Sequence, residues 1–177
     1  EMQTQIQRCK TIVSGILMSA GETRGESSGE TTVCEFFDDL VHEWRSTRKI
    51  GELSFNNRFG DDIDIASDTV LKQTICNLLD NALEASPDWV ELEVSRETDN
   101  LIIRVADRGP GFKHEVFDRL GQPYQSTKGR PGSGLGLFLV FNVARILGGQ
   151  VQARNRDSGG AEVSLSLPLD ALQLKEA

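Results

Sequence analysis

The sequence predicts an α+β domain in which a mixed, mostly antiparallel sheet is covered on one face by about three helices. Apolar residues recur with the helical period in long segments and alternate with polar residues in shorter ones. Two pairs of the shorter segments are separated by turn-forming residues, as antiparallel strands are. Because the helices and strands do not follow one another as regular βαβ units, a wholly parallel sheet is not expected.

The composition is that of one globular domain. Of 177 residues, 38% are hydrophobic and 26% charged, which supports one core but not two large domains. The formal net charge of -8 argues against nucleic acid as the main partner, because binding to a phosphate backbone favours positive charge. The apolar stretch 137–147 is shorter than the roughly 18 residues needed to span a bilayer, so we expect no part of this chain to cross a membrane.

Cysteine usage fits a reducing cytoplasm. Cys9, Cys34 and Cys76 are odd in number and far apart, so neither a disulfide framework nor a CxxC-type metal site is expected. The chain begins at Glu1 with no charged and apolar leader, and we expect it to be a fragment of a longer protein.

The N-terminal residues predict a helix of a helical bundle. Their apolar positions are spaced 4, 3, 4 and 3, the rhythm of helices that pack together: Met2, Ile6, Cys9, Val13 and Ile16. We expect residues 1–20 to be the second helix of a helical hairpin. Residues 21–31, rich in Gly, Ser and Glu, are expected to be a linker, and residues 32–177 a separate domain.

Within that domain, Thr32 is expected to cap an amphipathic helix that ends before Gly51. Short strands are expected around residues 53–55 and 63–65. Ser67 is then placed to cap a second helix, which ends at Pro87. The remaining elements are two antiparallel strand pairs, with a third helix between them at about 135–147: strands 90–94 with 101–105, and 151–153 with 163–167.

Acidic residues are absent from positions 119–156, where several cations occur. The cations are Arg119, Lys128, Arg130, Arg145, Arg154 and Arg156. A basic stretch in an acidic chain is either a solvated face or an anion site.

Two glycine-rich segments could bind phosphate. Asp107, Gly109 and Gly111 follow a predicted strand, and residues 132–137, GSGLGL, precede a predicted helix. Glycines before a helix let backbone N–H groups approach phosphate, and the helix dipole favours the negative charge. Taken alone, the first segment also fits a turn that closes a strand, and the second a linker. Neither matches the P-loop or the dinucleotide GxGxxG pattern.

Asn77 and Asn81 lie four residues apart on the second predicted helix and so share a face. Their amide oxygens could meet one Mg²⁺, which prefers oxygen ligands and takes others from substrate phosphates. The alternative is two ordinary surface or capping asparagines.

These segments occur in one order, with Phe117, Tyr124, Thr127 and Lys128 between the glycine-rich parts. The arrangement resembles the N, G1, F and G2 boxes of the catalytic and ATP-binding domain of sensor histidine kinases. Residues 159–161 followed by AEVSLSLP also resemble that family's C-terminal hairpin, so the resemblance covers about residues 32–169.

The resemblance implies the Bergerat-type α/β sandwich of the GHKL superfamily, with ATP and Mg²⁺ bound under a mobile lid. By position, Asp107 accepts from the adenine amino group, Gly109 and Gly111 shape the base pocket, and Asn81 binds Mg²⁺ with Asn77 alongside. The implied nucleotide-binding residues are Asn77, Asn81, Asp107, Gly109, Gly111, Phe112, Lys128, Arg130, Gly132, Ser133, Gly134, Leu135 and Gly136.

Three departures from the family pattern stand out. Glu84 occupies a position that is basic in many members, and Phe117 and Tyr124 bracket a looser F box. The phosphoacceptor motif is missing: His42 is followed by Glu and Trp without the expected Pro and lies too close to Asn77. His42 is therefore expected to be a histidine on the first domain helix, and His114 a lid or surface residue.

The resemblance implies an ATP-dependent protein histidine kinase whose phosphoacceptor histidine is on a dimerisation domain absent here. The implied partners are that domain, a second copy in a homodimer, and a response regulator with an acceptor aspartate. The whole protein is expected at the inner membrane, with this domain in the cytoplasm. The alternative is a GHKL module that switches conformation or sequesters a partner without phosphoryl transfer.

Residues 7–10, QRCK, together with the N box also resemble the RegB/PrrB redox-responding kinases. Cys9 on the N-terminal helix is therefore a possible redox site, and the alternative is a small apolar residue in a helix interface.

Overall fold

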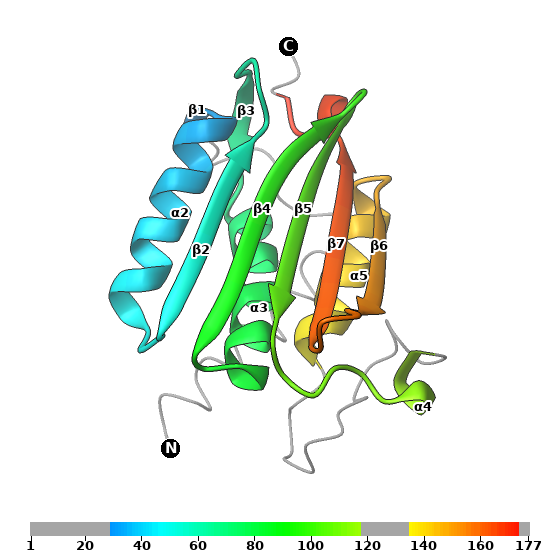
Figure 1. Ribbon diagram of the computed structural model, residues 1–177. Helices are drawn as coiled ribbons and strands as arrows, with labels where there is room; N and C mark the ends of the chain where they lie inside the picture. The colour runs from blue at the N-terminus through cyan, green and yellow to red at the C-terminus, as the bar shows by residue number, and fades with distance from the viewer. Residues whose placement is uncertain (1–28, 118–134, 174–177) are drawn as a thin grey trace.

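The computed structural model describes residues 29–117 and 135–173 (Figure 1). Its main sheet has five strands in the order β2-β4-β5-β7-β6. These are β2 (Glu52–Arg58), β4 (Trp89–Glu97), β5 (Asn100–Asp107), β7 (Ala161–Pro168) and β6 (Gln150–Asn155). Only β2 and β4 pair in parallel within this sheet, so the predicted mixed, mostly antiparallel arrangement is confirmed.

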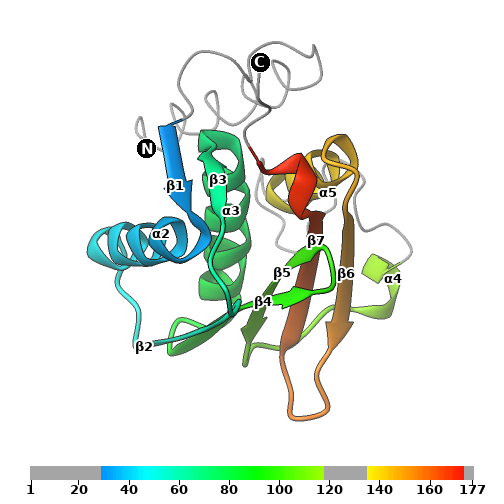
Figure 2. The ribbon, with the colours of Figure 1, turned by 90° about the horizontal axis from the view of Figure 1, so that it is seen from above.

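Three helices lie on the same face of the sheet (Figure 2). They are α2 (Val33–Thr47), α3 (Thr69–Ala85) and α5 (Leu135–Ile146). The remaining described elements are short: β1 (Gly29–Thr32), β3 (Asp64–Ser67), α4 (His114–Phe117) and a 3-10 turn at Leu169–Ala171. None of the helices within 29–117 and 135–173 is long and apolar enough to cross a membrane.

Alternation along the strands separates the two faces of the sheet. On β4, Val90, Leu92 and Val94 are fully buried, whereas the intervening Glu91 and Glu93 are not. Burying apolar surface is worth about 25 cal/mol per Å², so these positions determine which face the helices cover. Both predicted antiparallel pairs, β4 with β5 and β6 with β7, are confirmed.

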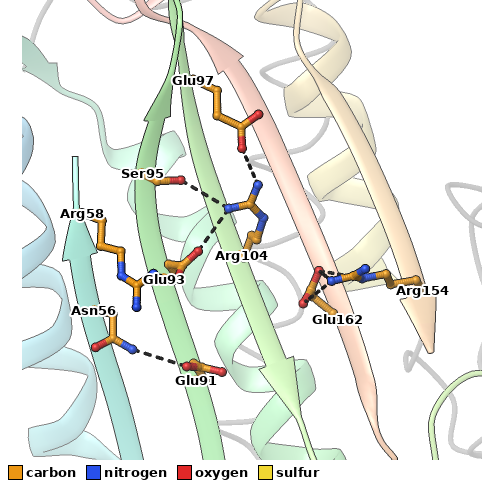
Figure 3. A network of polar contacts seen from close by, with 9 residues as sticks. All are labelled: Asn56, Arg58, Glu91, Glu93, Ser95, Glu97, Arg104, Arg154 and Glu162. Atoms are coloured by element: carbon orange, nitrogen blue, oxygen red, sulfur yellow. Dashed lines mark hydrogen bonds and ion pairs between the residues drawn. The ribbon is translucent and has the colours of Figure 1, made fainter. Parts of the chain in front are cut away.

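The face opposite the helices carries ion pairs between neighbouring strands (Figure 3). Arg104 donates to Glu93 at 3.1 Å and to Glu97 at 2.5 Å. Arg154 on β6 donates to Glu162 on β7 at 2.9 and 3.1 Å. These pairs are only partly shielded from water, so each contributes little to stability, and together they mark this face as the polar one.

The predicted cap of α2 is confirmed, because the Thr32 hydroxyl accepts from the Glu35 backbone N–H at 3.3 Å. Asp62 supports the same helix start by accepting from the backbone N–H of Cys34 at 3.0 Å. The cap of α3 differs from the prediction: Asp68, not Ser67, accepts from the Val70 N–H at 2.7 Å.

The expected linker at 21–31 extends too far towards the C-terminus. Gly29–Thr32 forms β1 and pairs antiparallel with β3, where Thr31 lies opposite Ile65. This two-stranded sheet is anchored by Ile65 of β3, which is fully buried in the core. The predicted helix at 1–20, with Cys9, and the rest of the linker lie outside the described residues.

Asp80 ties α2 to α3. Its carboxylate accepts from the Trp44 indole N–H at 2.8 Å and from the Arg48 guanidinium at 2.7 and 2.9 Å. Trp44 is 1% exposed, so its indole N–H has lost most access to water. The Arg48 guanidinium also lies 5.4 Å from the Trp44 ring centroid.

We expect Asp80→Ala to destabilise the domain by about 1–3 kcal/mol, because it leaves the buried indole N–H of Trp44 without its acceptor. Asp80→Asn should cost less, since an amide oxygen can still accept from the indole while only the partly exposed pairing with Arg48 is weakened. Urea unfolding followed by circular dichroism checks both variants. Equal stability of Asp80→Ala and the unsubstituted chain would show that Asp80 does not tie the two helices together.

Candidate nucleotide site

Asp107 ends strand β5 and is only 7% exposed. Its Oδ1 accepts from the backbone N–H of Gly109 at 2.8 Å and from that of Ala161 at 3.2 Å. No hydrogen bond from the described residues reaches Oδ2. The carboxylate is thus held in one orientation by two backbone donors, with its second oxygen available as an acceptor for a ligand.

The glycines after Asp107 are needed for close packing. A Cβ on Gly109 would lie 2.6 Å from the Ala85 carbonyl oxygen at the end of α3. Gly111 has φ +74, and a Cβ there would lie 2.7 Å from Asn155 Oδ1. The segment after β5 therefore passes directly against both α3 and the end of β6, which only glycine permits at these two positions.

Phe112 continues this segment and packs against the core. Its ring meets that of Phe117 edge to face, with the centroids 5.7 Å apart. Asn155 makes two hydrogen bonds to the backbone of Phe112. The Oδ1 of Asn155 accepts from the Phe112 N–H at 2.7 Å, and its Nδ2 donates to the Phe112 carbonyl at 2.9 Å.

Asn81 lies where α3 meets the start of α5. A Cβ on Gly136 would lie 3.3 Å from Asn81 Nδ2, so the first turn of α5 passes beside this amide. Asn81 is exposed, whereas Asn77 is half-buried and accepts from Gln73 Nε2 at 3.2 Å. An exposed amide oxygen at a junction of two elements suits an ion that takes its other ligands from water and phosphate.

The last turn of α3 joins both glycine-rich segments. Gly136 lies against Asn81, and Gly109 lies against Ala85, four residues later on the same helix. Four helical residues rise by about 6 Å. The structure therefore brings Asp107, Gly109, Asn81 and Gly136 into one neighbourhood, although they are far apart in the sequence.

Other predicted site residues fall outside the described part of the chain. They are Lys128, Arg130, Gly132, Ser133 and Gly134, with most of the lid expected between Gly111 and Gly132; the side chain of Leu135 is also outside the described part. His114 is exposed on α4, with its ring centroid 6.4 Å from that of Phe117. His42 is exposed on α2, the element on which it was expected.

Two cations of the acid-free stretch have partners of their own. Arg154 pairs with Glu162 on the opposite face of the sheet. Arg156 donates from Nη1 to the Asp107 carbonyl oxygen at 3.1 Å. The stretch is therefore not one continuous anion-binding surface.

The sequence interpretation missed Asn155, Arg156 and Ala161 as neighbours of the segment 107–112. These residues surround the turn of the β6–β7 hairpin, 43 to 54 positions away from their partners. The Gly159-Gly160 pair marked the turn, but no local pattern indicates what such a turn will contact.

The cysteines in the described part are poor candidates for redox chemistry. Burial, with the nearby Asp80 carboxylate, raises the pKa of the Cys76 thiol. Burial and a hydrogen bond with Asp62 likewise raise the pKa of Cys34. A raised pKa reduces the fraction of reactive thiolate, so neither thiol replaces Cys9 as the predicted redox site.

Comparison with known proteins identifies the family. Residues 66–171 match the histidine kinase-, DNA gyrase B- and HSP90-like ATPase family. A stretch of 103 residues is 40% identical to the signal transduction histidine-protein kinase AfsQ2 of Streptomyces coelicolor, covering 54% of this chain and 19% of that protein. A stretch of 99 residues is 37% identical to the sensor protein QseC of Escherichia coli K12, covering 55% and 22%.

Solved structures share the fold. The catalytic domain of histidine kinase ThkA superposes with a TM-score of 0.67 at 22% identity, over 81% of this chain and 96% of that one. Full-length ShkA in complex with AMPPNP gives 0.76 at 21% identity, over 98% and 37%. The chain spans about a fifth of the length of the two curated relatives named above. It belongs to the family of histidine kinase-, DNA gyrase B- and HSP90-like ATPases.

Proposed function

We propose that this domain binds ATP with Mg²⁺ and transfers the γ-phosphoryl group to a histidine on a dimerisation domain, for relay to a response-regulator aspartate. The observation that carries the proposal is the contact of the last turn of α3 with both glycine-rich segments. It provides a buried carboxylate acceptor near one end of the turn and an exposed amide beside the start of α5 at the other.

In this proposal each group has a separate task. Asp107 accepts from the adenine amino group, while Gly109 and Gly111 keep the backbone close to the base. The N-terminal turn of α5 faces the phosphates, where its dipole and backbone N–H groups favour negative charge. Lys128 and Arg130 would add charge there, and Asn81, with Asn77 nearby, would hold the Mg²⁺, which neutralises phosphate charge when bound.

This chain's contribution to phosphoryl transfer would then be mostly positioning and electrostatic stabilisation. The acceptor histidine and any base beside it would come from the dimerisation domain of the whole protein. We further propose that the whole protein is a membrane-anchored homodimer with this domain in the cytoplasm, and that Cys9 gives it a redox response. The relatives are a histidine-protein kinase and a sensor protein, which supports phosphoryl transfer over a switch without transfer.

The test is transfer of label from γ-labelled ATP to a separately supplied phosphoacceptor hairpin. We expect acid-labile label on the hairpin histidine and none on this chain alone, because His42 and His114 are not in acceptor motifs. ATP binding without transfer to the hairpins of several sensor kinases would instead support the switch. Stoichiometric label on His42 would contradict the assignment of the acceptor to another domain.

Asn81→Ala should remove most of the Mg²⁺-dependent part of ATP affinity, roughly a tenfold loss, because it deletes the exposed amide oxygen beside α5. Affinity measured in EDTA should change little. Gln152→Ala is the control, since it removes an exposed amide from β6 and is not among the predicted site residues. An equal effect of Asn81→Ala with and without Mg²⁺ would rule out its role as an ion ligand.

A further inference from the structure

The turn of the β6–β7 hairpin holds the segment that follows β5. Asn155 makes two hydrogen bonds to the backbone of Phe112, one as acceptor and one as donor. Ala161, at the other side of the turn, donates its backbone N–H to Asp107 Oδ1 at 3.2 Å. The hairpin thus contacts both ends of the segment 107–112.

Arg156 is the side chain at the centre of this contact. Its Nη1 donates to the Asp107 carbonyl oxygen, and its guanidinium carbon lies 5.1 Å from the centroid of the Trp89 ring. The same indole has Arg108 at 4.1 Å. Trp89 is 8% exposed, so Arg156 lies against a nearly buried aromatic surface that limits where its guanidinium can lie.

The backbone of the turn is closed around the same residue. Arg156 donates its N–H to the Gly160 carbonyl at 3.0 Å, and Gly159 donates to the Arg156 carbonyl at 3.0 Å. Gly160 lies so close to Asp107 that a Cβ there would be 2.0 Å from its carbonyl oxygen. Asp107 is therefore fixed by the hairpin at both its backbone and its carboxylate.

We infer that Arg156 is a positioning residue for base recognition: it fixes the backbone of Asp107 so that Oδ2 faces the amino group of adenine. The inference rests on the proposed function, because it assumes that the ligand is ATP. Arg156 acts through Asp107 and does not bind phosphate, since its guanidinium is already engaged at the base end of the site. Its contribution is to specificity for the base, more than to affinity for the triphosphate.

The test compares ATP with purine riboside triphosphate, which lacks the exocyclic amino group, by calorimetry on the whole chain. Arg156→Ala should weaken ATP binding about fivefold to twentyfold and purine riboside triphosphate binding less than about twofold. Arg154→Ala is the matched control, because it removes the same charge two positions earlier in the chain, at a side chain that pairs with Glu162 and does not contact Asp107 (Figure 3). It should leave both affinities unchanged.

Arg156→Lys keeps a charged donor of similar reach and should restore most of the preference for ATP. An equal loss for both nucleotides, or no loss for either, would overturn the inference while leaving the proposed function in place. If the unsubstituted chain binds neither nucleotide, the proposed function fails, and the inference fails with it. If Arg156→Ala does not fold, Arg156→Gln replaces it: a lower preference for ATP than in Arg154→Ala supports the inference, and a preference equal to that of Arg154→Ala overturns it.

Discussion

Asp107→Asn is expected to weaken ATP binding roughly tenfold to a hundredfold, the effect of losing one hydrogen bond to a charged group. The substitution is nearly isosteric. The N–H groups of Gly109 and Ala161 both require an oxygen at the Oδ1 position, so the introduced NH₂ group must occupy the position of Oδ2. There the NH₂ group would face the adenine amino group, and because both groups are donors no hydrogen bond can form between them.

Asp107→Asn should also change the preference of the site between ATP and inosine triphosphate. The amide introduced by Asp107→Asn can donate to the 6-oxo group of hypoxanthine, so inosine triphosphate should lose less affinity than ATP or gain some. Calorimetric titration of both nucleotides measures the ratio. Unchanged ATP affinity would remove the assignment of adenine to Asp107, and a parallel loss for both nucleotides would indicate a local folding defect instead.

Gly160→Ala is expected to destabilise the domain by about 2–5 kcal/mol. Gly160 has φ +88, a conformation that costs an L-residue about 1–2 kcal/mol. The added Cβ would also lie 2.0 Å from the Asp107 carbonyl oxygen and 2.7 Å from its carbon, so the hairpin and β5 must separate. Strain of this kind in a packed region adds about 1–3 kcal/mol.

Gly159→Ala provides the control for this prediction. Gly159 has nearly the same φ, +89, but a Cβ there would have nothing within 4 Å. The difference between the two variants in urea unfolding therefore isolates the clash with Asp107. If both lose the same stability, the added Cβ of Gly160→Ala does not clash with Asp107.

The helices and strands were predictable because burial imposes a period on the sequence. Val33, Phe37, Leu40 and Trp44 follow the helical period and are buried on α2, and β4 alternates as expected. The prediction was wrong in detail where two neighbouring residues could cap the same helix, as Ser67 and Asp68 could. It also missed β1, whose four residues have no apolar pattern and pair only because β3 is anchored in the core.

The candidate site was predictable only in part. Asp107, the glycines and Asn81 each lie in a local pattern, and the family resemblance predicts that these patterns form one site. Asn155 and Arg156 carry no such local signal, because their role depends on which segment the hairpin turn meets in space. A contact between residues 43 to 49 positions apart follows from the sheet order, which a single sequence does not specify.

A crystal structure of this chain with Mg²⁺ and a non-hydrolysable ATP analogue tests the central claim most directly. We expect the adenine amino nitrogen about 3 Å from Asp107 Oδ2, the metal ion on Asn81, and the phosphates at the N-terminus of α5. We also expect the hydrogen bonds of Arg156 and Ala161 to Asp107 to be retained. A base bound away from Asp107, or an ion that does not contact Asn81, would contradict the account.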